Sequence, residues 1–452
     1  MPNSRDIRIT EVRINFQDFA YRAPLKFGGN RVDEVTLLDV NIRVRDRAGR
    51  ECDGSASMAM GNIWSWPTSR YTYDETLAVM KRLAERLAAL VGDCDEYGHP
   101  IELGVLLEPA YEGVARELER ELGLVERIPK LCLLVTASAF DAAIHDAYGR
   151  SLGVNVYNAY GAGFMNRDLS SYLPDLFEGE YLDRYTLREP RPRMPLYHLV
   201  GALDPLTESD IPQRLDDGYP ETLSEWIVAD GLTHLKIKLN GDDLDWDVDR
   251  VLAIDRICQE TQARRGVERW VYSTDFNEKC PNVDYLIAFL RRIEEGIAEA
   301  FERIQYIEQP TSRYLFEHRE NTMHEASAIK PVVIDEALVD LEHLLLAIEL
   351  GYSGVALKTC KGQTQALLMG AYALKHDLFL CVQDLTLVGD AFLHSAGLCA
   401  RLPGIAAIEG NGRQYCPAAN LDWAREWPGL FEIDDGTIGT GVLTLPGLGH
   451  HR

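Results

Sequence analysis

The chain has 452 residues, of which 46% are hydrophobic and 26% charged, a composition typical of a soluble globular enzyme. This length exceeds one ordinary domain and fits a single barrel with an accessory domain. Its 46 basic and 71 acidic residues give a net charge of −25, which argues against a general nucleic-acid binder because such proteins carry a basic surface.

Nine cysteines are spread along the chain without any C-x-x-C pair, so we expect free thiols in a reducing compartment. The first residues contain no apolar signal core, and no run approaches the ~18 apolar residues of a membrane span. These features predict a soluble cytoplasmic protein that has no membrane contact.

The N-terminal region, residues 1–150, is predicted to form an α+β domain. Residues 7–14 alternate apolar and polar side chains, and residues 35–44 do so after an apolar start, as strands do. Two loops are expected here. Residues 24–31 contain glycines, and residues 58–67 are rich in methionine, tryptophan and glycine. The second loop is interpreted either as a buried apolar loop or as a lid that supplies specificity.

The pattern becomes helical between residues 73 and 122, and residues 137–148 predict a helix of small residues that can pack closely. Asp141, His145 and Asp146 lie at helical spacing within this second segment. We interpret them as residues of an interface, or as residues behind the site, rather than as catalytic groups.

From residue 190 to residue 414, short apolar or β-branched runs alternate with longer helix-like segments, which predicts parallel βαβ units. Eight such runs are present, the number that a closed (β/α)₈ barrel needs. They cover residues 194–200, 235–239, 271–277, 304–310, 332–336, 354–358, 378–384 and 405–409. Residues 415–452 resume short strands and turns, and we expect them to return to the N-terminal domain.

Three consecutive predicted strands end in a carboxylate: Asp275, Glu308 and Asp335. In a closed parallel barrel the C-terminal ends of the strands face one mouth, so the three side chains should converge. Hard carboxylate oxygens suit Mg²⁺, which keeps its other positions for water or substrate oxygens. The sequence therefore predicts a magnesium site at this mouth.

Lysines accompany the carboxylates. Lys236 and Lys238 are two residues apart, so their side chains share one face of a strand. Because two neighbouring ammonium groups repel, we expect the pKa of at least one to be lowered toward that of a useful general base. Lys358, four strands later, should stand across the mouth from this pair.

These groups together suit the removal of a proton next to a carboxylate. That proton is weakly acidic, and the enolate that forms must be stabilised strongly. A divalent ion held by three carboxylates supplies this stabilisation, and lysines on opposite faces can remove and return protons.

The motifs, in this order and spacing, resemble those of the enolase superfamily, specifically the mandelate racemase/muconate lactonizing enzyme-like proteins. The resemblance spans nearly the whole chain. It implies an α+β capping domain, a modified (β/α)₇β TIM-type barrel and a C-terminal segment that completes the cap. The matching motifs are Lys236-Ile237-Lys238, Asp275-Phe276-Asn277, Ile307-Glu308-Gln309-Pro310, Asp335-Glu336, Leu357-Lys358 and Pro446-Gly447-Leu448-Gly449.

The resemblance also implies roles. The three carboxylates would hold Mg²⁺, Lys238 would be one acid/base, and Lys236 would modulate it and contact the substrate carboxylate. Lys358 would be the acid/base on the other face. Lysines on both faces resemble the muconate lactonizing branch, and Gln383 stands near the place where another branch has a histidine. Further candidates for substrate contact are Asp384 and Glu409, and the loops around Phe27 and Met58–Trp64 resemble those that set specificity.

The predicted function is therefore a Mg²⁺-dependent enzyme that abstracts the α-proton of a small-molecule carboxylate substrate to give a metal-stabilised enolate. It would be a racemase or epimerase, a cycloisomerase or a lyase. A sugar-acid dehydratase of the same superfamily is the main alternative. A Schiff-base aldolase using Lys358 does not explain three carboxylates, and a non-catalytic member would lack a ligand or base, of which none is missing. A symmetric homo-oligomer is the expected assembly.

Overall fold

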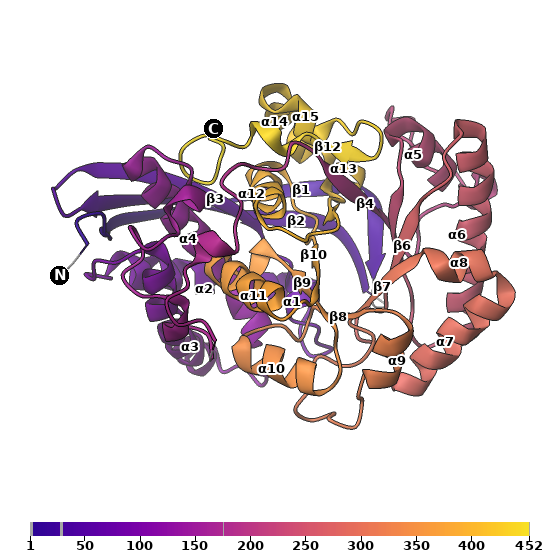
Figure 1. The fold of residues 1–452 in the computed structure, drawn as a ribbon, viewed down its shortest axis with the longest axis horizontal. Helices are drawn as coiled ribbons and strands as arrows, with labels where there is room; N and C mark the ends of the chain where they lie inside the picture. The colour runs from indigo at the N-terminus through magenta and orange to yellow at the C-terminus, as the bar shows by residue number, and fades with distance from the viewer. Residues whose placement is uncertain (1–2, 28–29, 175, 452) are drawn as a thin grey trace.

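The chain forms an N-terminal sheet with helices and, beside it, a closed barrel (Figure 1). The description rests on a computed structural model, which describes residues 3–27, 30–174 and 176–451. Within these ranges, no helix is both long enough and apolar enough to cross a bilayer.

Three antiparallel strands in the order β1-β2-β3 make the N-terminal sheet. Their bounds are Ile7–Phe27, Asn30–Asp46 and Glu51–Ala59. The first two strands are much longer than the runs predicted from alternation. As a result, the flanks of the predicted loop at 24–31 belong to strands, and its Gly28 and Gly29 lie outside the described residues.

Helix α4 (Lys130–Leu152) packs against β2 and β3 and is buried along almost its whole length. Small residues allow the close approach. A Cβ added to Gly54 of β3 would lie 2.3 Å from the backbone nitrogen of Ala147, so only glycine fits there. The close packing predicted for the small-residue helix is confirmed. The other helices of this region are α1 (Asn62–Ser65), α2 (Tyr73–Gly92) and α3 (Pro100–Leu122).

Eight parallel strands follow, and the pairing of β11 with β4 closes them into a barrel. They run in chain order around the barrel, so each neighbour in sequence is also a neighbour in space. Their bounds are β4 Met194–Val200, β5 His234–Lys238, β6 Val271–Asp275, β7 Ile304–Glu308, β8 Val332–Ile334, β9 Gly354–Leu357, β10 Phe379–Val382 and β11 Ile408–Glu409. The predicted (β/α)₇β TIM-type barrel with an α+β cap is confirmed.

Helical segments connect successive strands on the outside of the barrel (Figure 1). Two helices, α7 and the shorter α8, share the connection from β6 to β7, and each other connection has one α-helix. The bounds are α5 Leu223–Asp230, α6 Leu244–Arg265, α7 Val283–Gly296, α8 Ala298–Arg303, α9 His324–Ile329, α10 Leu341–Glu349, α11 Gln363–Lys375 and α12 Gly389–Arg401.

The C-terminal segment contacts both parts of the molecule. Strand β12 (Thr437–Ile438) pairs antiparallel with β4 of the barrel. Further on, the backbone N–H of Leu448 donates to Asp146 Oδ1 of α4 at 2.9 Å. The short helices before these contacts are α13 (Gly412–Tyr415), α14 (Leu421–Glu426) and α15 (Pro428–Phe431). The division into domains at 1–150, 190–414 and 415–452 stays a prediction.

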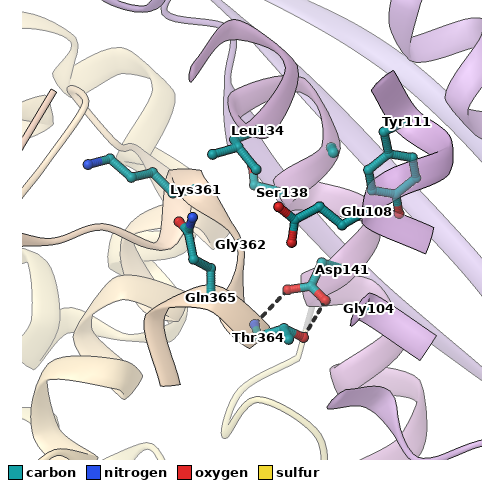
Figure 2. A pocket seen from close by; sticks show the side chains of 11 residues that line it. Gly104, Glu108, Tyr111, Leu134, Ser138, Asp141, Lys361, Gly362, Thr364 and Gln365 are labelled. Carbon is teal, nitrogen blue, oxygen red and sulfur yellow. Dashed lines mark hydrogen bonds between the residues drawn. The ribbon is translucent and has the colours of Figure 1, made fainter. Parts of the chain in front are cut away.

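A polar contact joins the N-terminal region to the barrel. Asp141 of α4 accepts hydrogen bonds from the backbone N–H and the hydroxyl of Thr364 in α11, both at 2.7 Å (Figure 2). His145, one turn further along α4, hydrogen-bonds the same hydroxyl at 2.9 Å. The interface role predicted for Asp141 and His145 is confirmed, and this contact fixes the segment that carries Lys361 (Figure 2).

The burial of Asp141 at this contact makes stability depend on pH. Burial raises the pKa of Asp141 to about 6, although the bonds from Thr364 act in the opposite direction. Because the folded pKa exceeds the unfolded one, this stabilising contribution is fully present below about pH 4 and is lost as the pH rises through about 6. Relative to an Asp141→Asn variant, the wild-type free energy of unfolding should fall by up to about 3 kcal/mol between acidic and neutral pH. Urea unfolding at both pH values measures this, and a difference that does not change with pH contradicts it.

Candidate active site

Charged side chains stand at the C-terminal ends of five neighbouring strands. Strand pairing aligns Lys238 of β5 with Asp275 of β6, and Asp275 with Glu308 of β7. Asp335 follows β8, and Lys358 follows β9. The strand order therefore places a row of three carboxylates with a lysine at each end, at one mouth of the barrel.

Lys236 lies beneath this row, with 1% of its surface exposed, and its ammonium group has four oxygen partners. The partners and their distances from Nζ are Glu308 Oε1 at 2.8 Å, Gln383 Oε1 at 2.8 Å, Glu409 Oε2 at 3.0 Å and Asp275 Oδ2 at 3.1 Å. Such a group is held in place by its partners and balances the charge of buried carboxylates.

The expected lowering of a lysine pKa within the Lys236/Lys238 pair is wrong for Lys236. Burial lowers the pKa of Lys236, but Glu308, Glu409 and Asp275 outweigh it and raise the pKa well above its ordinary value. The attraction of the surrounding carboxylates outweighs the repulsion between the two ammonium groups, and the spacing of the lysines in the sequence does not reveal those carboxylates.

Lys238 has fewer partners than Lys236. Its Nζ donates to Asp275 Oδ2 at 2.5 Å, and the ring of Phe27, at the end of β1, has its centroid 5.8 Å from this nitrogen. Burial raises the pKa of Asp275, but Lys238 and Lys236 outweigh it and bring the pKa to about 2. Lys238 thus lies between a fully ionised carboxylate and an aromatic ring of the N-terminal region.

Lys358 occupies the corresponding place at the other end of the row. Its Nζ lies 2.9 Å from Asp335 Oδ2 and donates to the backbone carbonyl of Asp384 at 3.0 Å. The ring centroid of Trp64 lies 4.3 Å from the same nitrogen, a cation–π distance. Each terminal lysine therefore pairs with one carboxylate and one aromatic ring from the N-terminal region.

Lys361 was not predicted from the sequence as a residue of the site. Its ammonium group is buried and lies 3.1 Å from Asp335 Oδ1, so two lysines share this carboxylate. The signal was its position three residues after Lys358, since a 3₁₀ turn at Thr359–Lys361 brings both side chains to one side. The partnership of Gln383 with Lys236 was also missed.

Asp384 and Glu409 both reach the site, in different ways. Glu409 contacts the Lys236 ammonium group. The Asp384 carboxylate accepts backbone N–H bonds from Leu387 at 2.7 Å and Asn411 at 2.8 Å, and so holds the ends of two strands together. Burial and the nearby Glu409 raise the pKa of Asp384 to about 7.

The donor set suits a hard divalent ion in chemistry, though not in its present arrangement. Three carboxylates stand on adjacent strand ends, and Glu308 Oε2 is buried with no hydrogen-bond partner among the described residues. Across the same described ranges, however, no three acidic, histidine or cysteine side chains are positioned to hold one ion. Lysine ammonium groups lie against Asp275 and Asp335 instead.

The fold and the site together define a class: capped (β/α)₇β barrels with an acidic and basic cluster at the strand ends. The family described as "Enolase C-terminal domain-like" matches residues 219–451, just over half of the chain. The protein belongs to this family, within the mandelate racemase/muconate lactonizing enzyme group of the enolase superfamily. It is thus related to cycloisomerases, epimerases and racemases.

Solved structures share the fold along the whole chain. A muconate lactonizing enzyme from Pseudomonas fluorescens, complexed with muconolactone, has 19% identity and a TM-score of 0.61, with 98% of this chain and 96% of that chain covered. A dipeptide epimerase from Enterococcus faecalis, complexed with Mg and L-Leu-L-Tyr, has 14% identity and a TM-score of 0.63, covering 98% and 99%. An N-succinyl Arg/Lys racemase from Bacillus cereus has 16% identity and a TM-score of 0.62, covering 98% and 95%. No curated protein sequence matches the chain.

Proposed function

We propose that this protein is a Mg²⁺-dependent enzyme that removes the α-proton of a small carboxylate substrate to give an enolate. The reaction would be racemisation or epimerisation, cycloisomerisation or elimination. The observation that carries the proposal is the row of three carboxylates with Lys238 at one end and Lys358 at the other. A substrate bound over the carboxylates would meet an amine on each face of its α-carbon.

In this proposal Lys238 and Lys358 move protons, and Lys236 does not. The Lys236 ammonium group has four oxygen partners and is fixed, so its role is to supply positive charge beside the developing enolate. Lys238 has one carboxylate partner among the described residues, so one rearrangement frees its nitrogen to take a proton.

Asp275, Glu308 and Asp335 are the proposed ligands of the metal ion. When bound, the ion would stabilise the negative charge that develops on the substrate carboxylate. Binding requires the lysines to move away from Asp275 and Asp335, and long lysine side chains permit this. Two structural neighbours support a small carboxylate as substrate, since one contains muconolactone and the other Mg with a dipeptide.

The substrate side chain is proposed to lie against the N-terminal region. Phe27 and Trp64 cover the two terminal lysines, and a small cavity between them is also lined by Tyr21, Leu25 and Met60. These apolar walls favour a substrate with an apolar group near its carboxylate.

Deuterium exchange tests the proposal directly. The protein is incubated in D₂O with Mg²⁺ and a library of acid sugars, N-acyl amino acids, dipeptides and lactones, and NMR detects exchange at carbons next to a carboxylate. We expect exchange with at least one class, and we expect EDTA to abolish it and Lys238→Ala to slow it by about 10²- to 10⁴-fold. Lys279→Ala, which removes an exposed lysine outside the row, is the matched control and should keep full exchange. Exchange that survives both EDTA and Lys238→Ala would show that the proposed chemistry is wrong.

A further inference from the structure

A second cavity, of about 450 Å³, lies between the N-terminal region and the barrel loops after β7 and β8. It is large enough for a small metabolite. None of the lysines or carboxylates of the row lines it. Its walls come from residues 66–67 and 126–131 on one side, and from residues 313–314 and 336–343 on the other.

Two side chains that line this cavity, those of Arg313 and Glu336, each have one buried polar atom without a hydrogen-bond partner among the described residues. Arg313 donates through Nε and Nη2 to Glu278 and through Nη2 to the Trp64 carbonyl, but its buried Nη1 has no partner among the described residues. Glu336 accepts at Oε1 from Trp64 Nε1 at 2.9 Å and from Asn277 Nδ2 at 3.0 Å. Its buried Oε2 likewise has no partner in the described part of the chain.

Such atoms cost free energy, because each has lost water without gaining a hydrogen bond. One belongs to the guanidinium group of Arg313, a donor, and the other to the carboxyl group of Glu336, an acceptor, and both residues line the same cavity. A ligand that places an acceptor on Arg313 and a donor on Glu336 would satisfy both. The bond from the Arg313 guanidinium to an anionic ligand group would be charge-assisted, and so would a bond from a ligand ammonium group to Glu336.

The rim adds a further positive charge. Arg127 is exposed and forms no ion pair with any described residue, whereas its neighbour Lys130 is paired with Asp340 at 2.8 Å. His343 is held by the same carboxylate at 2.7 Å. Arg127 is therefore the cation at the rim that remains available for an anionic ligand group.

The rest of the lining is largely apolar, with Trp66, Pro67, Pro129, Leu131, Ala337 and Val339. We propose that this cavity binds a free α-amino acid with an apolar side chain. The carboxylate meets Arg313 Nη1 and Arg127, the ammonium group meets Glu336 Oε2, and the side chain packs on the apolar wall. No residue of the lysine row lines this cavity, although Glu336 directly follows Asp335, and amino-acid binding here does not depend on the proposed reaction.

Calorimetry with L-leucine tests this on the 452-residue chain, with EDTA present and, separately, with Mg²⁺. Two leucine analogues each lack one of the two charged groups: 3-methylbutylamine lacks the carboxylate, and 4-methylpentanoate lacks the ammonium group. We expect leucine to bind at one site in EDTA, and each analogue to bind at least about tenfold more weakly, as loss of a charge-assisted bond predicts. Binding that needs Mg²⁺ would assign leucine to the lysine row and overturn the proposal.

Leucine binding by two variants provides a second test. Glu336→Gln keeps the shape but replaces the ammonium acceptor, and Arg127→Ala removes an exposed cation without touching the core. Both should weaken leucine binding at least about fivefold, while Arg256→Ala, which removes an exposed arginine on α6, should leave it unchanged. Circular dichroism confirms folding, and Arg127→Ala carries the test alone if the buried substitution unfolds the chain. Absence of leucine binding, or equal binding by wild type and Arg127→Ala, refutes the assignment.

Discussion

Replacing Lys238 with alanine is expected to lower the rate of α-proton exchange by about 10²- to 10⁴-fold, the usual contribution of a positioned acid or base. Lys358→Ala should have an effect of the same size. Each lysine ends the carboxylate row on its own side, so neither can take over the proton transfer of the other. The measurement is single-substrate exchange in D₂O, followed by NMR for each stereoisomer.

The pair of variants also separates the possible reactions. If protons are removed from one face and returned to the other, each variant should lose exchange of a different stereoisomer. If one lysine acts only through its charge, its arginine variant should be far more active than its alanine variant. At the position of the other lysine, arginine should not replace the amine. Full activity in both alanine variants contradicts the assignment of these residues.

Replacing Lys236 with methionine is expected to destabilise the protein by about 3–5 kcal/mol, as is typical when one partner of a buried ion pair is removed. The change would leave Glu308, Glu409 and Asp275 together in the interior without the ammonium group that now lies within 3.1 Å of each. Chemical denaturation in EDTA measures the loss.

Mg²⁺ provides the control for this variant. If the carboxylates hold the ion, saturating Mg²⁺ should stabilise Lys236→Met more than it stabilises the wild type, because the ion replaces the missing charge. Lys375→Met, which removes a half-buried lysine paired with Glu180 outside the barrel mouth, should show no such difference. An equal gain in both variants argues against a metal bound at these carboxylates.

The barrel could be predicted because its evidence is local and repeated. Each strand is a short apolar run, and the charged residue that ends it appears in the sequence beside that run, as with Ile307 and Glu308. Parallel topology then brings separate strand ends to one mouth. The row from Lys238 to Lys358 follows from these two facts alone.

The contacts from the N-terminal region could not be predicted in the same way. The ring of Trp64 lies over Lys358 although 294 positions separate them in the sequence, and no periodicity links the two. The pKa of Lys236 was likewise inaccessible, since it depends on how many carboxylates surround one nitrogen. The unexpected length of β1 and β2 reflects pairing between the two strands, which outweighs weak alternation in each.

Trp64 has a consequence for how such proteins diversify. Its carbonyl accepts from Arg313, its indole N–H donates to Glu336, and its ring covers Lys358. A loop transplanted from a relative would bring a new side chain to this point while leaving three barrel residues shaped for tryptophan. The loop and these barrel positions should therefore change together during evolution. A chimera that exchanges only the loop should be inactive, and exchange of residues 313 and 336 together with the loop should restore activity.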